Sequence, residues 1–262
     1  MEIVGIHLIQ SLALVATPRR SVVARIDGDG TLVALDRAGD DSDLIAHLPA
    51  GADIVVVDAP LAVPDDRGQR DLERVMAWRD APVFPASRAR LHKVFGGMRG
   101  VDLTARLHAH ATHGAWEASP DQVLRQIIWE RAHPAGAPAI DLGEYRAAWA
   151  ALRAPVYRPK ASGRARAAGL LPAWELVNSV LDLRGWTPTD APDDWVAIDD
   201  AACIDALCCA YAGLRALGGA GGGATRLGTA DRGRIVVPAD ANLSRRLELT
   251  VDRMRAEGSI RI

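Results

Sequence analysis

The chain has 262 residues, of which 49% are hydrophobic and 24% are charged, and its formal net charge is −2. This composition is typical of a folded globular protein, and it argues against a disordered chain or a strongly basic nucleic-acid binder. The apolar segment 3–16 is interrupted by His7 and Gln10 and is too short to cross a bilayer, so we expect no membrane association. Cys203, Cys208 and Cys209 match no zinc-binding spacing and are expected to be reduced core residues of a cytoplasmic protein.

The first quarter of the chain is predicted to follow the order β-β-β-α-β. Asp27-Gly28-Asp29-Gly30, between two runs of strand-forming residues, is typical of a hairpin turn. Ser42 is the expected N-cap of a short helix. Ile54-Val55-Val56-Val57 is bounded by turn signals, which indicates a strand buried on both faces. The expected elements are strands at 3–8, 21–26, 31–35 and 54–57 and a helix at 43–48.

Helices dominate the prediction for the rest of the chain. Leu72, Val75 and Met76 recur at helical spacing, and Ser119-Pro120 is a typical helix start. The segment 80–114 gives no clear pattern, and the glycine tract 218–223 is predicted to be a loop. The expected elements are helices at 69–78, 119–133, 144–152, 172–183, 199–217 and 243–255 and strands at 139–142 and 234–237. We therefore expect one α/β domain over 1–262, with a helical insertion at about 65–135 and a C-terminal strand and helix at about 234–256.

Two aspartates occupy positions where a carboxylate is costly. Asp58 follows the buried strand directly, at the edge of the sheet where α/β proteins bind ligands. Asp205 lies between Ile204 and Leu207 in a helix that is expected to be buried. A buried carboxylate requires a hydrogen bond, an ion pair or a metal. The alternatives are a turn-capping role for Asp58 and an arginine or hydrogen-bond partner for Asp205.

Two further acids and two basic runs complete the candidate residues. Asp199 or Asp200 is expected to cap the late helix, with Asp200 as a candidate site residue. Lys160 with Arg158, Arg164 and Arg166 forms a basic run that can bind phosphate or can simply be solvated. A second basic run comprises Arg88, Arg90, His92, Lys93 and Arg99. The spacing of His108, His110 and His113 matches no established zinc motif.

Five short segments of the chain resemble motifs of a known family. Gly5-Ile6-His7-Leu8 resembles an opening G-I-D-x-A strand, and Val57-Asp58-Ala59-Pro60-Leu61 matches I-D-A-P-L. The segment 204–210 resembles x-D-A-L-x-x-A, and 234–238 resembles a closing G-x-I-x-x-P. Tyr157-Arg158-Pro159-Lys160 is similar to a Y-K segment. Together these blocks resemble the predicted RNase H-fold nucleases that are catalogued as domain of unknown function 429.

The resemblance implies an RNase H-like fold, with a mixed five-stranded sheet flanked by helices. It implies that residue 7, Asp58 and Asp205, with Asp200 as a further acid, bind one or two Mg²⁺ or Mn²⁺ and hydrolyse phosphodiester bonds in nucleic acid. The family has an aspartate where this chain has His7. Because imidazole is a poor ligand for Mg²⁺, three outcomes are open: a changed metal, a single metal site, or no catalysis.

The resemblance leaves two alternatives to a metal-dependent nuclease. The first is a catalytically silent RNase H-fold binding protein, which the histidine at position 7 favours. The second is a phosphotransferase of the sugar kinase and actin type, although the glycine-rich phosphate loops of that class are not evident in the sequence. A homodimer is left open.

Overall fold

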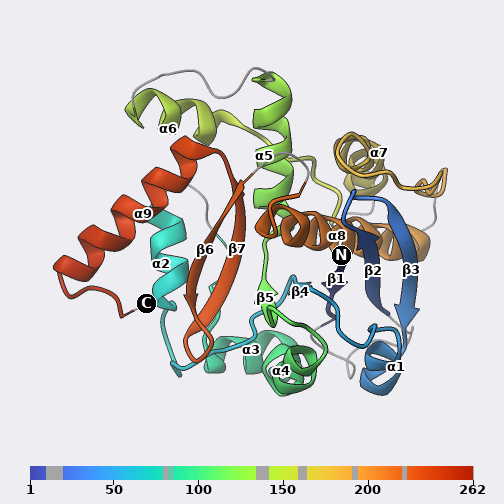
Figure 1. Ribbon diagram of the computed structural model, residues 1–262, viewed down its shortest axis with the longest axis horizontal. Helices are drawn as coiled ribbons and strands as arrows, with labels where there is room; N and C mark the ends of the chain where they lie inside the picture. Colours follow the sequence, from blue (N-terminus) through green and yellow to red (C-terminus); the bar gives the residue numbers. More distant parts are fainter. Residues whose placement is uncertain are drawn as a thin grey trace.

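The computed structural model describes residues 1–9, 20–78, 83, 85–133, 142–158, 164–190, 194–219 and 223–261. Within this part of the chain, a mixed seven-stranded sheet runs in the order β3-β2-β1-β4-β5-β7-β6 (Figure 1). The strands are β1 Glu2–His7, β2 Ser21–Asp27, β3 Leu32–Ala38, β4 Ile54–Val57, β5 Ala115–Glu117, β6 Gly223–Thr229 and β7 Gly233–Ala239. The helices are α1 Asp41–Ala46, α2 Asp71–Trp78, α3 Arg88–Phe95, α4 Arg99–Ala109, α5 Pro120–Ala132, α6 Leu142–Ala151, α7 Arg164–Asn178, α8 Asp194–Ala216 and α9 Ala241–Ala256.

The predicted α/β class is confirmed, but the sheet has seven described strands rather than five. Strand β1 is antiparallel to β2 and parallel to β4, whereas β5 is parallel to both β4 and β7. Strand β5 has only three residues, which is too short for any periodicity to reveal, and β6 begins at the last glycine of the expected loop. The segment 65–135 therefore contains a strand of the central sheet besides its helices.

Several helix boundaries differ from the prediction. Helix α1 is capped by Asp40 rather than by Ser42, and α7 begins eight residues earlier than expected. Helix α8 begins at Asp194, so Asp199 and Asp200 lie inside the helix and cannot be its N-cap. The segment 80–114, which had no clear pattern, contains α3 and α4. The strand expected at 139–142 falls outside the described residues except for Leu142, which begins α6.

Helices cover both faces of the sheet (Figure 1). On one face, α5, α7 and α8 pack on apolar side chains of β1, β2 and β4, and the three buried free cysteines belong to this core as predicted. On the other face, Leu44 of α1 and Leu103 and Leu107 of α4 meet a second set of side chains from the same strands. Helices α2, α6 and α9 form a third core with β6 and β7. No helix in the described part of the chain has the length and apolar character that a bilayer crossing requires.

Two glycines bring α8 directly onto the centre of the sheet. A Cβ at Gly5 of β1 would lie 2.1 Å from the carbonyl oxygen of Ala206 and 2.2 Å from the backbone nitrogen of Ala210. A Cβ at Gly213 of α8 would lie 2.7 Å from Ile3 Cγ2. The backbones of α8 and β1 are therefore in contact, which places Asp205 next to the end of β1.

A buried ion network ties α2 to the sheet at the end of β5. Arg70 donates from Nε to Glu73 Oε1 at 2.7 Å, and from Nη1 and Nη2 to the two carboxylate oxygens of Glu117 at 2.7 and 2.8 Å. Backbone N–H groups of Leu61 and Ala86 donate to the same two carboxylates. All three charged side chains are buried, and together they hold the loop between β4 and α2 in place.

Candidate metal centre

The pleat of the sheet places His7 and Asp58 on the face that α8 covers. Side chains alternate along a strand, so His7 shares a face with Ile3, whereas Ile6 points to the opposite core. Asp58 directly follows β4, and by the same alternation it shares a face with Val56. Because β1 and β4 are adjacent and parallel, both side chains reach the same carboxyl edge of the sheet.

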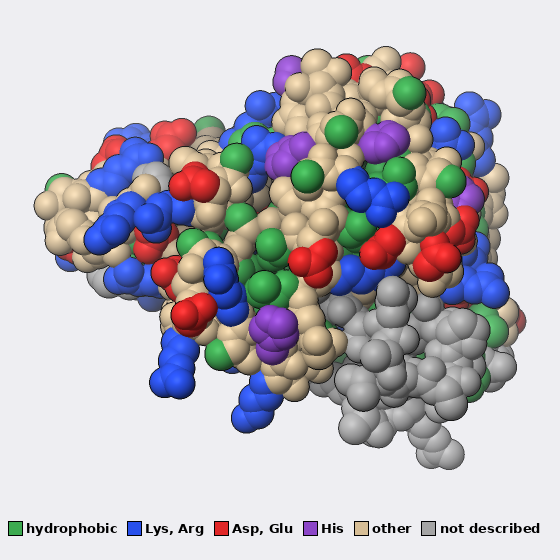
Figure 2. Space-filling view, turned by 90° about the horizontal axis from the view of Figure 1, so that it is seen from below, with side chains coloured by type: hydrophobic (Ala, Val, Ile, Leu, Met, Phe, Trp, Pro, Cys, Tyr) green, Lys and Arg blue, Asp and Glu red, His purple; other side chains and the backbone are tan. Residues whose placement is uncertain are grey.

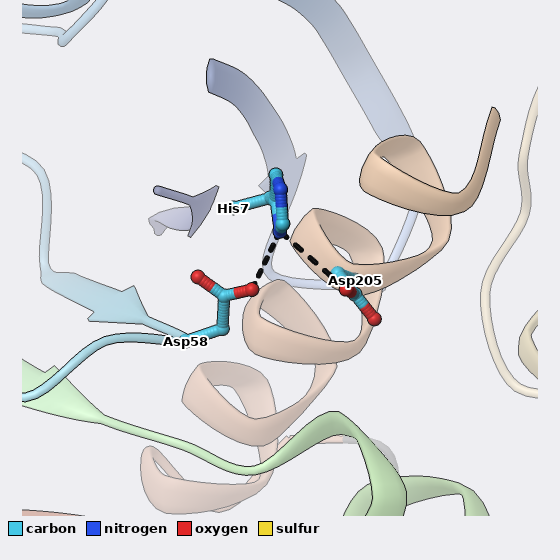
Figure 3. A group of neighbouring side chains, drawn as sticks. All are labelled: His7, Asp58 and Asp205. Carbon is cyan, nitrogen blue, oxygen red and sulfur yellow. Dashed lines mark hydrogen bonds and ion pairs between the residues drawn. The ribbon is translucent and has the colours of Figure 1, made fainter. Parts of the chain in front are cut away.

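His7, Asp58 and Asp205 form a compact group at this edge (Figure 3). Ligand atoms of the three side chains all lie within 4.8 Å of one another. Nδ1 of His7 is 2.6 Å from Oδ2 of Asp58 and 3.4 Å from Oδ2 of Asp205. The backbone N–H of Leu8 donates to the other oxygen of Asp58 at 2.8 Å, which fixes that carboxylate. The side chain of His7 is 24% exposed, whereas those of Asp58 and Asp205 are 9% and 3% exposed.

Two residues from the segment after α6 complete the surroundings of Asp205. Arg158 donates from Nε to Oδ2 at 2.8 Å and from Nη2 to Oδ1 at 2.8 Å, which is a bidentate pair. The hydroxyl of Tyr157 donates to Oδ1 of the same carboxylate. Nη1 of Arg158 also lies 3.4 Å from Asp121 Oδ1. The structure therefore bears out the expected alternative for Asp205, because its carboxylate is paired with an arginine. The same carboxylate also lies close to His7.

The charges of this group balance when His7 is protonated. Although burial opposes its charged form, the carboxylates of Asp58 and Asp205 raise the pKa of His7 to about 10. The carboxyl group of Asp205 is also penalised by burial, but Arg158 and His7 hold its pKa well below its usual range. At neutral pH the imidazolium and the guanidinium thus offset two carboxylates, and the proton on Nδ1 sits between the two acids.

His7, Asp58 and Asp205 can together bind one metal ion if the proton on Nδ1 of His7 is released. A neutral imidazole nitrogen and two carboxylates can then converge on one ion, and an ion at that position takes over the charge of the proton. Both oxygens of Asp205 are already engaged by Arg158, which leaves little capacity for a second ion. Of the metals that the resemblance implies, the nitrogen ligand favours Mn²⁺ over Mg²⁺.

The remaining candidate residues lie elsewhere or point elsewhere. Asp200 accepts a hydrogen bond from the backbone N–H of Thr189 at 2.8 Å and is not part of the group. Lys160 lies outside the described residues, and Arg164 begins α7. Arg158 faces Asp205 and Asp121, so its expected contact with phosphate stays a prediction.

One member of the second basic run is already engaged inside the protein. Arg99 is 7% exposed and is bonded to Asp41, Ser21 and the carbonyl oxygen of Ile9. Figure 2 shows acidic and basic side chains interspersed on the face seen from below, rather than a continuous basic surface. Nucleic-acid binding by this run therefore also stays a prediction.

The positions of Tyr157 and Glu117 near the metal centre could not be predicted from the sequence. Tyr157 lies in the segment that resembles the Y-K motif, but its bond to Asp205 depends on how an irregular chain returns to α8. Glu117 belongs to no recognisable sequence pattern, yet it ends β5 beside Val57 at the same sheet edge.

His108 accepts a hydrogen bond from the backbone N–H of Ala115 at 2.9 Å rather than joining a metal site with the other two histidines.

The protonated His7 predicts a pH dependence of stability. Its pKa is raised from 6.5 to about 10 on folding, so its contribution is fully present below about pH 6.5 and is lost as the pH rises through about 10. We expect chemical denaturation to show that the free energy of unfolding of the wild type falls over this range by up to a few kcal/mol more than that of His7→Gln. Parallel pH profiles for the two proteins would contradict a charged His7.

Comparison with known proteins adds no family assignment. The chain matches no family model, and neither the curated proteins nor the solved structures give a match. The resemblance to RNase H-like nucleases therefore depends on the sequence blocks given above.

Proposed function

We propose that this protein binds one divalent metal ion through His7, Asp58 and Asp205 and hydrolyses phosphodiester bonds in nucleic acid. The observation that carries the proposal is the convergence of three ligand atoms, within 4.8 Å of one another, at the carboxyl edge of β1 and β4. That edge is where open α/β sheets bind their ligands. The resemblance to RNase H-like nucleases supplies the reaction class.

The residues of the chain have separate tasks in this proposal. A bound divalent ion would lower the pKa of a water molecule and would stabilise negative charge on a phosphodiester. The Leu8 N–H and the Arg158 guanidinium hold the carboxylates of Asp58 and Asp205 in fixed orientations. Arg158, whose side chain is 37% exposed, can in addition contact a phosphate oxygen from the solvent side.

Metal binding is expected to raise the melting temperature. Mn²⁺ at about 100 times its Kd adds about 2.7 kcal/mol to stability, which corresponds to about 5–10 °C for a chain of this size. The shift should be larger at about pH 8 than at about pH 6, because the ion must displace the proton of His7. Differential scanning fluorimetry measures it, and the addition of EDTA should reverse it.

The matched variant for this experiment is Asp58→Asn, which keeps the shape of the side chain. We expect it to lose the Mn²⁺ response, whereas Asp200→Asn, on the same helix as Asp205 but outside the group, should keep it. A wild type that shows no response to Mn²⁺, Mg²⁺ or Zn²⁺ would eliminate the metal site. An equal response in Asp58→Asn would place the ion elsewhere.

Cleavage is tested separately from binding. Single-stranded, duplex and branched DNA and RNA are incubated with the Mn²⁺-loaded protein. Asp58→Asn is expected to reduce the cleavage rate about 100-fold or more, because loss of a residue that only orients a metal ligand already costs about 10–100-fold. Metal binding without cleavage of any of these polymers would retain the metal site and reject the nuclease.

A silent binding protein is the second candidate, and one observation favours it specifically. Asp205 is satisfied by Arg158, Tyr157 and His7, so the group is charge-balanced without a metal. In that case His7→Asp should lower stability by removing the imidazolium, and it should gain no metal response. A gain of Mg²⁺ response in His7→Asp would instead support the metal site.

A further inference from the structure

A pair of arginines shares one face of the sheet with a tryptophan. Arg226 of β6 is aligned with Val236 of β7, and residues two apart on a strand share a face, so Arg226 and Arg234 are diagonal neighbours. Glu117 of β5 is aligned with Ile235, which places Trp116 beside Arg234 on that face. Arg226 is exposed, and the other two side chains are half-buried.

Both guanidinium groups lie against the indole ring. The guanidinium carbon of Arg234 is 4.5 Å from the Trp116 ring centroid, and that of Arg226 is 5.6 Å from it. Arg234 also donates from Nε to the carbonyl oxygen of Ala115 at 2.8 Å. Arg226 donates from Nη2 to the carbonyl oxygen of Ala216 at 2.6 Å. These contacts hold the two cations close together.

The groups that contact the two arginines carry no negative charge. Nη2 of Arg234 is 2.9 Å from Nδ1 of His108. This histidine nitrogen accepts a hydrogen bond from the backbone N–H of Ala115, so it carries no proton. Burial and the neighbouring Arg234 both lower the pKa of His108, which keeps the ring neutral. Within the described residues, neither arginine has a carboxylate within ion-pair distance. Two positive charges that are held close together repel each other.

Only part of this repulsion is offset inside the protein. Ala216 is the last residue of α8, and the negative end of the helix dipole favours a cation there. Arg234 has no such helix end, and its pKa is lowered by burial and by the charge of Arg226. A bound anion would meet both cations at once.

We propose that Arg226 and Arg234 form a binding site for a phosphate group. A phosphate carries up to two negative charges and can accept hydrogen bonds from two guanidinium groups, which matches this pair in charge and in hydrogen-bonding capacity. The Arg226 side of the site lies away from the candidate metal centre, because Ala216 is eleven residues after Asp205 on α8, about 16 Å along the helix. The proposal is independent of the nuclease function.

Isothermal titration calorimetry in EDTA tests the site with three probes: inorganic phosphate, AMP and a short single-stranded oligonucleotide. We expect Arg226→Gln and Arg234→Gln each to weaken phosphate binding at least tenfold. The matched control is Arg245→Gln, which removes one positive charge from the exposed surface of α9 and should leave binding unchanged.

The three probes distinguish the sources of the phosphate. Equal affinity for inorganic phosphate and AMP supports a site for the phosphate group alone, and tighter binding of AMP or the oligonucleotide supports a nucleotide or a strand as its source. No binding at millimolar concentrations of any probe would overturn the proposal. An equal loss of phosphate affinity in Arg245→Gln and Arg226→Gln would also overturn the proposal, because the effect would then reflect the net charge of the protein. Arg226 is exposed, so its variant remains informative even if Arg234→Gln fails to fold.

Discussion

Replacement of Arg70 by methionine is expected to lower the free energy of unfolding by about 3–5 kcal/mol. The guanidinium contacts two buried carboxylates, those of Glu73 and Glu117, and also donates to the carbonyl oxygen of Ala62 at 2.8 Å. Methionine has a similar length but no charge, so the variant leaves both acids buried without their cation. Urea or guanidinium denaturation at neutral pH measures the loss.

The control for this variant is Arg67→Met, because Arg67 is exposed on the same loop. It should change stability by less than about 0.5 kcal/mol. The pH dependence gives a second check: burial already raises the pKa of Glu73 in the wild type, and in Arg70→Met the opposing effect of Arg70 is removed. A carboxyl group whose pKa is raised on folding is least destabilising when it is protonated. The difference in stability between Arg70→Met and the wild type should therefore become smaller as the pH falls. A loss similar to that of Arg67→Met would show that the network contributes little.

The network also matters for the candidate metal centre. Glu117 is aligned with Val57 in the sheet, one residue before Asp58, and it accepts from the backbone N–H of Leu61 at 3.0 Å. The loop that leaves the metal centre is thus anchored within a few residues of Asp58. We infer that its stable position depends on a buried ion network that contributes no ligand to the metal.

The parts of this fold that the sequence predicts are those with local causes. The β-branched run 54–57 and the apolar spacing of 72–76 report burial directly, and both elements are observed. The alternation of side chains along each strand and the parallel pairing of β1 with β4 are then enough to bring His7 and Asp58 together. Strand β5 and the approach of Tyr157 to Asp205 have no such local cause. They depend on long-range packing, which a single sequence does not encode in any short pattern.

The glycine at position 5 shows how a local signal can carry long-range information that is hard to read in advance. Within a strand, a glycine weakens the sheet, and one reason for it is the close approach of another backbone. Here the second backbone is α8, and the carbonyl oxygen of Ala206 lies only 2.1 Å from the position that the Cβ of any other residue would take. The sequence indicates that something is close to β1, but only the structure identifies it.

Gly5→Ala is therefore expected to cost about 3 kcal/mol or more, at the upper end for overpacked cores. The obstructing atoms belong to the backbone of α8, so the variant must move the helix away from β1. Asp205 directly precedes Ala206, and the same movement would separate its carboxylate from His7 and Asp58. We expect the variant to lose the Mn²⁺-induced rise in melting temperature even under conditions in which circular dichroism shows it to be folded. Gly97→Ala is the matched control, since nothing lies within 4 Å of a Cβ there, and it should keep both stability and metal response. If Gly5→Ala retains the full Mn²⁺ response, the contact between α8 and β1 does not set the geometry of the metal centre.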